Sequence, residues 1–240
     1  MAGTLRLVLR LGALIVALLA ALVAHGLWRL LRRPSPWPRW LLGSAARIVG
    51  ARVRVVGRPL RRDVVFLANH LSWIDILAIA GASGSAFVAK GELARAPLIG
   101  WLCTLNHTIF VSRDDRLGVA AQIDRLRAAL AQGQPVTIFP EGTTGDGRTL
   151  LPFKASLLAA LDPPPPGVRV QPLRMDYGAA TPELAWVGDE PGQAHALRVL
   201  RRPGRFTVTL TCLDAFDPAA LPGRKAIAAL ARERLAALRG

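Results

Sequence analysis

The chain has 240 residues, 52% of them apolar, and a mean hydropathy of +0.33, which is high for a protein without membrane contact. Its net charge of +15 suits an anionic bilayer surface, a phosphate-bearing lipid or a nucleic acid, so charge alone does not choose the partner. The two cysteines, Cys103 and Cys212, have neither metal-ligand spacing nor a disulfide framework, which is compatible with a reducing compartment and indicates no structural zinc.

The first membrane signal is an almost wholly apolar segment, residues 7–31. Together with its flanks, the uncharged core at 11–24 gives about 20 residues, enough for a helix to cross a ~30 Å hydrocarbon layer. A cleaved signal peptide is the alternative, but small residues are poorly placed for cleavage and the arginines downstream oppose translocation. These arginines form the heavier basic flank, at Arg29, Arg32, Arg33 and Arg39. They predict an inner-membrane protein whose remaining chain faces the cytoplasm.

A second apolar and basic stretch, residues 37–49, follows a run of prolines. Trp28, Trp37 and Trp40 lie close to the arginines, and both residue types favour the lipid headgroup zone. We expect an interfacial helix here, with an ordinary core helix behind a proline turn as the alternative. Residues 1–50 are thus predicted to form membrane-anchor and interfacial helices, and residues 51–240 a separate domain.

From residue 51 onward, short β-branched runs alternate with helical stretches. Strands are expected at 53–56, 64–68, 87–89, 108–111, 136–139, 168–173 and 206–213. Helices are expected at 73–80, 94–105, 117–131, 155–161 and 224–238. This alternation predicts an α/β fold with a mostly parallel central sheet flanked by helices.

His70 and Asp75 form the first chemical pattern, in the run Asn69-His70-Leu71-Ser72-Trp73-Ile74-Asp75. Five positions on one helix are about 140° apart, so the two side chains meet only if His70 precedes the helix. The sequence allows this, because a strand precedes His70 and Ser72-x-x-Asp75 has the form of a helix-opening capping box. That capping box alone could explain Asp75, and a bond to a backbone carbonyl could explain a buried His70.

The alternative for this pair is catalytic. The carboxylate would fix one imidazole tautomer and leave the other ring nitrogen as a general base. The sequence contains no G-x-S-x-G nucleophile motif, which favours direct transfer without a covalent enzyme intermediate.

The second pattern is Phe139-Pro140-Glu141-Gly142-Thr143-Thr144, directly after a predicted strand. By itself this is explained by a structural glycine turn. The clustering of Glu141, Thr143, Thr144 and Asp146 with three glycines favours a polar cradle, because backbone N–H groups and side chains can then face one ligand. Arg113 follows the strand at 108–111, at the sheet edge where α/β proteins bind ligands, and is either an anion clamp or a solvated surface charge.

Taken together, these motifs resemble those of the glycerolipid acyltransferase family, which includes 1-acylglycerol-3-phosphate acyltransferases. The N-H-x-x-x-x-D signature is met by Asn69, His70 and Asp75, and F-P-E-G-T by residues 139–143. An intermediate block at 90–100 and 109–113 is also similar, and a weaker match lies at 168–173, so the likeness runs from about residue 50 to 175. The resemblance implies an acyltransferase domain at 51–240, with His70 and Asp75 catalytic. It also implies four acceptor-binding residues, Arg113, Glu141, Gly142 and Thr143.

The resemblance implies a membrane-associated O-acyltransferase that moves a fatty acyl chain to the free hydroxyl of a lysolipid. The donor is expected to be a thioester of acyl carrier protein or coenzyme A, with no metal or redox cofactor. The expected acceptor is 1-acyl-sn-glycerol 3-phosphate, which would give phosphatidic acid in phospholipid biosynthesis. Ser112, Thr144 and Ser156 depart from the commonest family pattern. The string at 139–153 is similar to the branch that acylates lyso-ornithine lipid, which is the alternative acceptor.

Two other classes of function stay open. A non-catalytic basic module that binds membranes or nucleic acid would explain the charge. It gives no role to His70, Asp75 or Glu141, however, and the sequence has no recognisable nucleic-acid fold signature, so we expect no nucleic-acid partner. A hydrolase in which His70 activates water is the other possibility.

Overall fold

A seven-stranded sheet forms the centre of the protein in the computed structural model, which describes residues 1–32, 35–95, 97–111 and 118–238. The strands are β1 (Ala51–Val56), β2 (Val64–Ala68), β3 (Ala86–Lys90), β4 (Ile109–Val111), β5 (Val136–Ile138), β6 (Arg169–Asp176) and β7 (Phe206–Cys212). Their order is β1-β7-β6-β2-β5-β3-β4, and every neighbouring pair is parallel except β6 and β7. The predicted mostly parallel sheet is confirmed.

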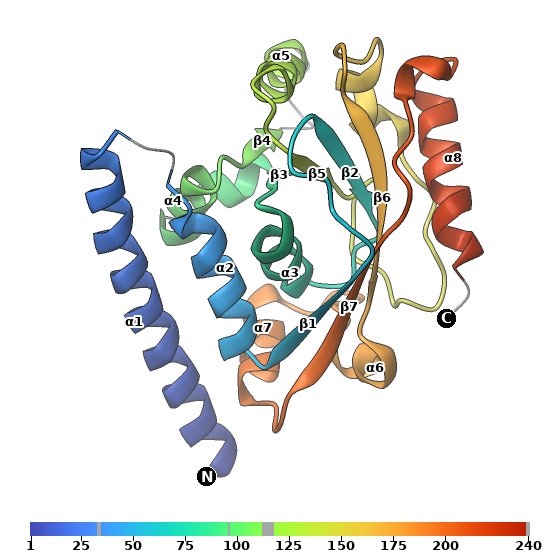
Figure 1. Ribbon diagram of the computed structural model, residues 1–240. Helices are drawn as coiled ribbons and strands as arrows, with labels where there is room; N and C mark the ends of the chain where they lie inside the picture. The colour runs from blue at the N-terminus through green and yellow to red at the C-terminus, as the bar shows by residue number, and fades with distance from the viewer. Residues whose placement is uncertain (33–34, 96, 112–117, 239–240) are drawn as a thin grey trace.

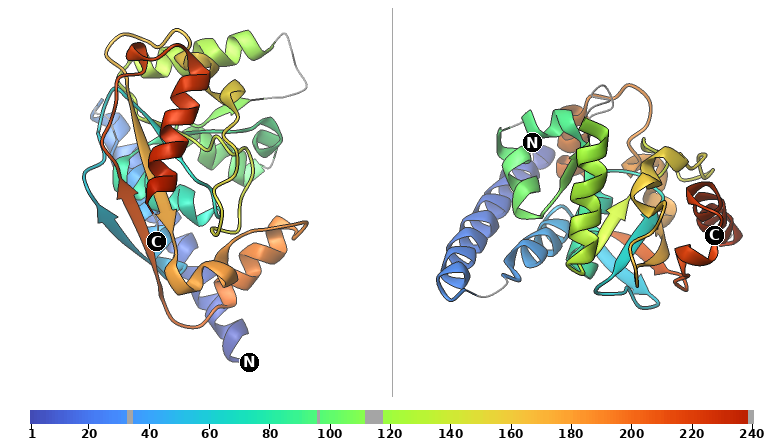
Figure 2. Two further views of the ribbon diagram at one scale, coloured as in Figure 1. Left: turned by 90° about the vertical axis from the view of Figure 1, so that its right-hand side faces the viewer. Right: turned by 90° about the horizontal axis from the view of Figure 1, so that it is seen from above.

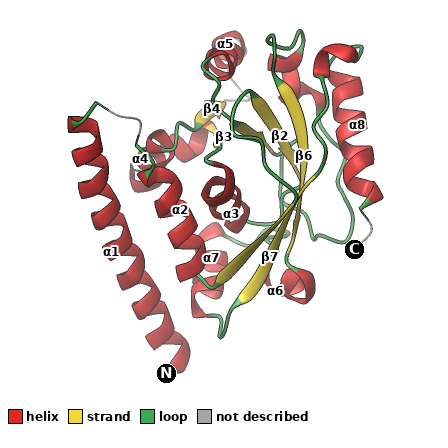
Figure 3. Cartoon of the chain, viewed as in Figure 1, coloured by secondary structure: helices red, strands yellow, loops and turns green. Residues whose placement is uncertain are grey.

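Helices cover both faces of this sheet (Figures 1 and 3). They are α1 (Ala2–Leu30), α2 (Trp37–Ile48), α3 (Ile74–Ser83), α4 (Pro97–Leu105), α5 (Gly118–Ala131), α6 (Thr181–Leu184), α7 (Gly192–Arg201) and α8 (Arg224–Ala237). Viewed from above, the sheet lies between the N-terminal helices on one side and α8 on the other (Figure 2). The predicted helix at 155–161 is present as a 3₁₀ helix, Ala155–Leu161.

Strand β2 lies near the middle of the sheet and separates two hydrophobic cores. Val64, Phe66 and Ala68 pack into the core under α2 and α3, whereas Val65 and Leu67 pack into the core under α5 and α8. Because side chains alternate across a strand and both faces are covered, all five positions must be apolar. This explains why the strand appears in the sequence as an uninterrupted apolar run, and it fixes the point from which the next loop leaves the sheet.

The sequence analysis did not predict two of the helices, α6 and α7. Helix α7 buries only His195, Val199 and Leu200, so its apolar stripe is narrow and one of its three buried positions is a histidine. A pattern search for apolar periodicity gives little signal for such a helix. Its place beside the sheet becomes clear only from its contacts.

Each of the two N-terminal helices docks onto the domain through an arginine that binds the last carbonyls of another helix. Arg10 of α1 donates hydrogen bonds to the carbonyls of Val199 and Leu200 at 3.0 and 3.1 Å, at the end of α7. Arg39 of α2 donates to Gly81 O and Ala82 O at 3.1 and 3.0 Å, at the end of α3. The last carbonyls of a helix have no intrahelical partner and carry partial negative charge, so a guanidinium satisfies and neutralises them.

Helices α2 and α3 cross at very short range, at Gly43 and Gly81. A Cβ added to Gly81 would lie 2.6 Å from the Cα of Gly43, closer than any real Cβ contact. Glycine at this crossing therefore allows the two backbones to touch, and α2 is fixed directly to α3.

Helix α1 lies along the domain and packs against α2 and α7 (Figure 1). Its opposite face is a stripe of exposed apolar side chains that runs its whole length: Leu5, Val8, Leu9, Ile15, Val16, Leu19, Val23, Leu27 and Leu30. The helix is long and apolar enough to cross a membrane, and only 11% of its most apolar 18-residue stretch is buried. One face thus has protein partners, and the other is left for an apolar environment.

Replacing Arg10 by alanine should destabilise the protein, because it leaves carbonyls at the end of α7 without their charged donor. We expect the free energy of unfolding to fall by about 1–3 kcal/mol, measured by urea unfolding in detergent solution. The matched control is Arg29→Ala, at an exposed position near the other end of α1, which should change stability by less than about 0.5 kcal/mol. Equal effects of the two substitutions would contradict this docking role.

Candidate active site

The loop that carries the first sequence motif starts from a fixed point at the end of β2. Asn69 Nδ2 donates to Met175 O at 3.0 Å, and Asn69 Oδ1 accepts from Met175 N at 2.7 Å. The amide side chain thus continues the hydrogen bonding between β2 and β6 beyond the end of β2. It holds residues 70–75, here called the 70–75 turn, at the carboxyl edge of the parallel sheet, where ligands bind in open α/β folds.

The buried carboxylate of Asp75 organises this turn. Its Oδ2 accepts hydrogen bonds from Leu71 N at 2.6 Å, Ser72 N at 3.0 Å and His70 Nδ1 at 2.9 Å. Its Oδ1 accepts from the hydroxyl of Tyr177, and Asp75 itself is 0% exposed. A carboxylate with donors on both oxygens acts as an acceptor throughout, so the imidazole proton lies on Nδ1. The Nε2 of His70 is then the basic nitrogen.

The prediction that His70 precedes the helix and meets Asp75 is confirmed. The capping explanation for Asp75 holds in part: the carboxylate reaches back to Ser72 N and Ser72 Oγ accepts from Ile74 N at 3.3 Å, but the cap residue of the helix is Trp73, not Ser72. One oxygen atom of Asp75 therefore starts the helix and orients the imidazole. The structural and the functional explanations of this motif do not exclude each other.

Phe139, the first residue after the neighbouring strand β5, fixes the plane of the His70 ring. The two rings stack with centroids 3.9 Å apart and planes 15° apart, and the His70 side chain remains 18% exposed. Within the described residues, Nε2 of His70 has no hydrogen-bond partner, while Nδ1 is held by Asp75. The arrangement is that of an oriented base, open on one side to a reactant.

The second motif forms the 139–147 turn, which is bonded to the first. Gly145 N donates to His70 O at 2.8 Å, so the two turns share a backbone hydrogen bond. At Gly147, φ is +77° and an added Cβ would lie 2.6 Å from Thr181 Cγ2, so only glycine fits. The predicted polar cradle therefore lies beside His70.

Glu141 points inward from this turn. It is 3% exposed, and the backbones of His70 and Leu151 hydrogen-bond to its side chain. Burial raises the pKa of Glu141 to about 8, and the negative charge of Asp75 adds to the increase, while those hydrogen bonds and Arg232 oppose it. At neutral pH this carboxyl is therefore mostly protonated. It ties the two turns together, and its contact with an acceptor stays a prediction.

The other predicted acceptor-binding residues have different places. Gly142 has φ of +70°, and its N–H donates to Phe139 O at 3.0 Å, which closes the turn. Thr143 is exposed at the tip, while the hydroxyl of Thr144 donates to Trp186 O. Arg113 lies outside the described residues, so its role stays a prediction. In the ranges that the structure describes, no three His, Cys, Asp or Glu side chains group as a metal site.

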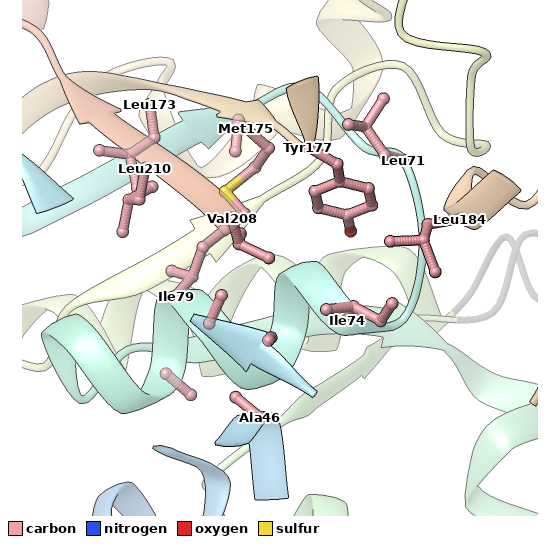
Figure 4. Packing of buried hydrophobic residues seen from close by; sticks show 14 of the residues in the cluster. Ala46, Leu71, Ile74, Ile79, Leu173, Met175, Tyr177, Leu184, Val208 and Leu210 are labelled. Atoms are coloured by element: carbon pink, nitrogen blue, oxygen red, sulfur yellow. The ribbon is translucent and has the colours of Figure 1, made fainter. Parts of the chain in front are cut away.

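Tyr177 is a member of the site that the sequence analysis missed. It is buried among Leu71, Ile74 and Leu184, with its hydroxyl directed toward the turn (Figure 4). Burial raises its pKa well above the usual range, and the charge of Asp75 raises it further, so the phenol stays protonated and donates. Tyr177 directly follows β6. Its place beside Asp75 could have been predicted only from the pairing of β6 with β2.

Comparison with known proteins gives three consistent results. A family model described as Acyltransferase matches residues 52–176, more than half of the chain. The lyso-ornithine lipid O-acyltransferase of Rhodobacter capsulatus is 34% identical over 95% of this chain and 88% of its own length. The 1-acyl-sn-glycerol-3-phosphate acyltransferase of Neisseria gonorrhoeae is 38% identical, but over 45% of this chain and 44% of its own.

The fold is also shared with a solved structure. The crystal structure of the 1-acyl-sn-glycerophosphate acyltransferase PlsC from Thermotoga maritima matches 98% of this chain and 95% of its own. The TM-score is 0.69 and the sequence identity 24%, which shows a common fold. The match includes the N-terminal helices, whereas the family model begins at residue 52. The boundary at residue 50 between helices and domain stays a prediction.

The raised pKa of Glu141 predicts how stability depends on pH. Between its ordinary value of 4.5 and about 8, the folded protein binds a proton that the unfolded chain has lost, so the free energy of unfolding falls as pH rises through this window. Glu141→Gln cannot ionise and lacks this decline. The free energy of unfolding of this variant minus that of the unsubstituted protein should therefore increase by about 2–4 kcal/mol from pH 5 to pH 9. Urea unfolding of both proteins at each pH measures this difference.

Glu233→Gln, at an exposed position of α8, is the control and should show no such gain. If the free energy of unfolding of both variants depended on pH in the same way as that of the unsubstituted protein, ionisation of Glu141 would not be the cause of the decline.

Proposed function

The chain belongs to the acyltransferase family, and on this premise we propose that it transfers a fatty acyl chain from a thioester to the free hydroxyl of a lysolipid. One observation supports this most directly: the contact of 2.9 Å between His70 Nδ1 and Asp75 Oδ2, which leaves Nε2 as a base at the open edge of the site. Direct transfer needs such a base to activate a hydroxyl, and it needs no enzyme nucleophile.

In the proposed mechanism, His70 Nε2 removes the proton of the lysolipid hydroxyl as its oxygen attacks the thioester carbonyl. The new C–O bond forms, the C–S bond breaks, and the imidazolium returns the proton to the departing thiolate. Asp75 stabilises the imidazolium, because its carboxylate lies against Nδ1 in a buried environment where charge interactions are strong. Asp75 keeps its orientation through four donors, so little reorganisation accompanies the transfer.

The 139–147 turn is proposed to hold the acceptor and the developing oxyanion. Thr143 is at its exposed tip, and Gly145 is bonded to the backbone of His70 itself. A reactant on the turn is therefore close to the base. We assign acceptor contacts to Glu141, Gly142 and Thr143, and also to Arg113, which follows the edge strand β4 in the sequence.

The proposed acceptor is lyso-ornithine lipid. Relatives with that name include the R. capsulatus protein, which matches 95% of the chain, and the Rhizobium meliloti protein, which matches 85% of it. The acceptor 1-acyl-sn-glycerol 3-phosphate is the second candidate, supported by the relatives from Neisseria, whose matches cover 45% of the chain. The donor is proposed to be an acyl thioester of acyl carrier protein or coenzyme A, with no metal or redox cofactor.

The protein is membrane-associated, and we propose that α1 lies in the bilayer surface at the cytoplasmic face of the inner membrane. Helix α1 is bonded to α7 of the domain through Arg10 in its first half, and it contacts α2 through the edge-to-face contact of Trp28 with Trp37 near its other end. A helix docked in this way lies beside the domain and does not separate its two ends across a bilayer. Its exposed apolar stripe then enters the lipid, which brings an amphiphilic acceptor to the domain.

Replacing His70 by alanine should lower kcat on the order of 10²-fold or more, because a general base contributes at least that much. The measurement is radiolabelled acyl transfer to lyso-ornithine lipid and to 1-acyl-sn-glycerol 3-phosphate. The matched control is His107→Asn, an exposed histidine with φ of 55°, a conformation that asparagine tolerates, and it should keep full activity.

Near-native activity of His70→Ala would refute the mechanism. A faster reaction with 1-acyl-sn-glycerol 3-phosphate would favour the second acceptor. Thioester cleavage without any acylated lipid would instead indicate a hydrolase.

The stripe on α1 predicts how the protein binds membranes. A Val16→Glu, Val23→Glu double variant places two charges on the exposed apolar face and should no longer float with phosphatidylglycerol vesicles. The control Leu197→Glu, on an exposed position of α7, should still float. The unsubstituted protein should stay bound in high salt and be released by detergent. Release by salt alone would contradict insertion of α1.

A further inference from the structure

The mechanism does not use a cluster of three aromatic residues, in which Trp73 of the 70–75 turn packs with His195 and Trp186 from outside the turn. His195 of α7 is 0% exposed and lies between two tryptophans. Its ring centroid is 6.4 Å from that of Trp73, nearly perpendicular, and 5.6 Å from that of Trp186, at 30°. Trp73 is the residue immediately before α3, the helix that carries Asp75.

The hydrogen bonds of His195 admit one tautomer. Trp73 Nε1 lies 2.9 Å from His195 Nδ1, and Leu184 O lies 3.1 Å from His195 Nε2. An indole nitrogen can only donate and a carbonyl oxygen can only accept. His195 is therefore neutral, with its proton on Nε2, and it serves as an acceptor for Trp73 and a donor to Leu184.

The cluster contacts the 70–75 turn at a second point. Trp186 N donates to Leu71 O at 2.8 Å, and the adjacent Leu71 N is one of the donors to the Asp75 carboxylate. The peptide groups on both sides of Leu71 are thus occupied, one by Asp75 and the other by Trp186. A shift of this cluster would move the donors on which the carboxylate of Asp75 depends.

Helix α7 itself is held by contacts of its last turn. Arg10 of α1 caps its last carbonyls, and Arg198 pairs with Glu190, just before the helix, at 2.7 Å. A support must be more rigid than the loop that it positions. These contacts give α7 that property, and they connect the membrane helix to the site through one helix of ten residues.

We propose that His195 is a positioning residue for the acyl transfer: its neutral imidazole, acting through Trp73, holds the 70–75 turn in the geometry in which His70 and Asp75 meet. This inference rests on the proposed function. A displacement of about 1 Å in a reacting group can cost about 10²-fold in rate, so a bond to Trp73 can affect kcat without touching the substrate.

The charges around His195 agree with a neutral ring. Burial lowers its pKa, and Arg198 lowers it further, whereas the bond to Leu184 O and the charge of Glu190 oppose the decrease. Protonation would put an N–H on Nδ1 against the indole N–H of Trp73, so that two donors would face each other. The stabilisation from this contact is complete above the ordinary pKa of 6.5 and is lost as pH falls through the lower value of the folded state.

Two isosteric substitutions separate the two bonds of His195. The amide of His195→Asn reaches the place of Nδ1 and can accept from Trp73, but it cannot reach Leu184. The amide of His195→Gln reaches the place of Nε2 and can donate to Leu184, but it leaves Trp73 without its acceptor. Trp73→Phe, His195→Leu and their combination complete a double-mutant cycle. Gln193→Ala, exposed on the same helix, is the control.

Each variant of the full chain is assayed in detergent at a temperature below its own thermal unfolding midpoint, with kcat and KM measured separately. We expect His195→Gln, His195→Leu and Trp73→Phe each to lower kcat about tenfold or more, with KM changed less than about twofold. His195→Asn should retain most of kcat, and the combined variant should lose no more than either single one.

Unchanged kcat in folded His195→Leu would overturn the proposal, and so would an equal loss in His195→Asn and His195→Gln. Additive losses in the combined variant would also overturn it, because the two residues would then act independently. An inactive unsubstituted protein would contradict the proposed function, whereas an active one with insensitive His195 variants would contradict only this inference.

Discussion

The structure depends on one buried charge, the carboxylate of Asp75. An ionised carboxylate removed from water is tolerated only when donors replace its hydration, since an unpaired buried charge costs several kcal/mol. Here the donors are the ring of His70, the backbone of Leu71 and Ser72, and the hydroxyl of Tyr177. They come from the loop after β2 and from the end of β6. The fold therefore cannot satisfy Asp75 without also assembling the base, so stability and catalytic geometry share the same contacts.

The surroundings of this carboxylate hold the base from several sides. Asn69 connects the ends of β2 and β6, Phe139 stacks on the imidazole, and Gly145 bonds to the backbone of His70. These contacts come from the ends of β2 and β6 and from the turn after β5, at one edge of the parallel sheet. A loop so restrained loses little additional freedom when a reactant binds, which is how a reactive group on a loop can be as well oriented as one on a helix.

The N-terminal helices, which we propose meet the membrane surface, are attached to the same region. Arg10 and Arg39 use guanidinium groups to satisfy the carbonyl ends of α7 and α3, and Gly43 lets α2 touch α3 directly. The helix that starts with the 70–75 turn is thus in contact with the helices proposed to meet the lipid. A lysolipid has its hydroxyl near the headgroup and its chain in the bilayer, so an enzyme that acts on it needs its base close to that boundary.

The sequence by itself determined the parts of this protein that depend on neighbouring residues. The strands, the long apolar helix at the N-terminus and the position of His70 just before a helix follow from periodicity and turn chemistry, which act over a few residues. Only the tertiary structure decided that Tyr177 donates to Asp75 across 102 positions, that His195 accepts from Trp73 across 122, and that Glu141 points inward. These contacts depend on the order of strands in the sheet and on what burial leaves unpaired, and no local pattern carries that information.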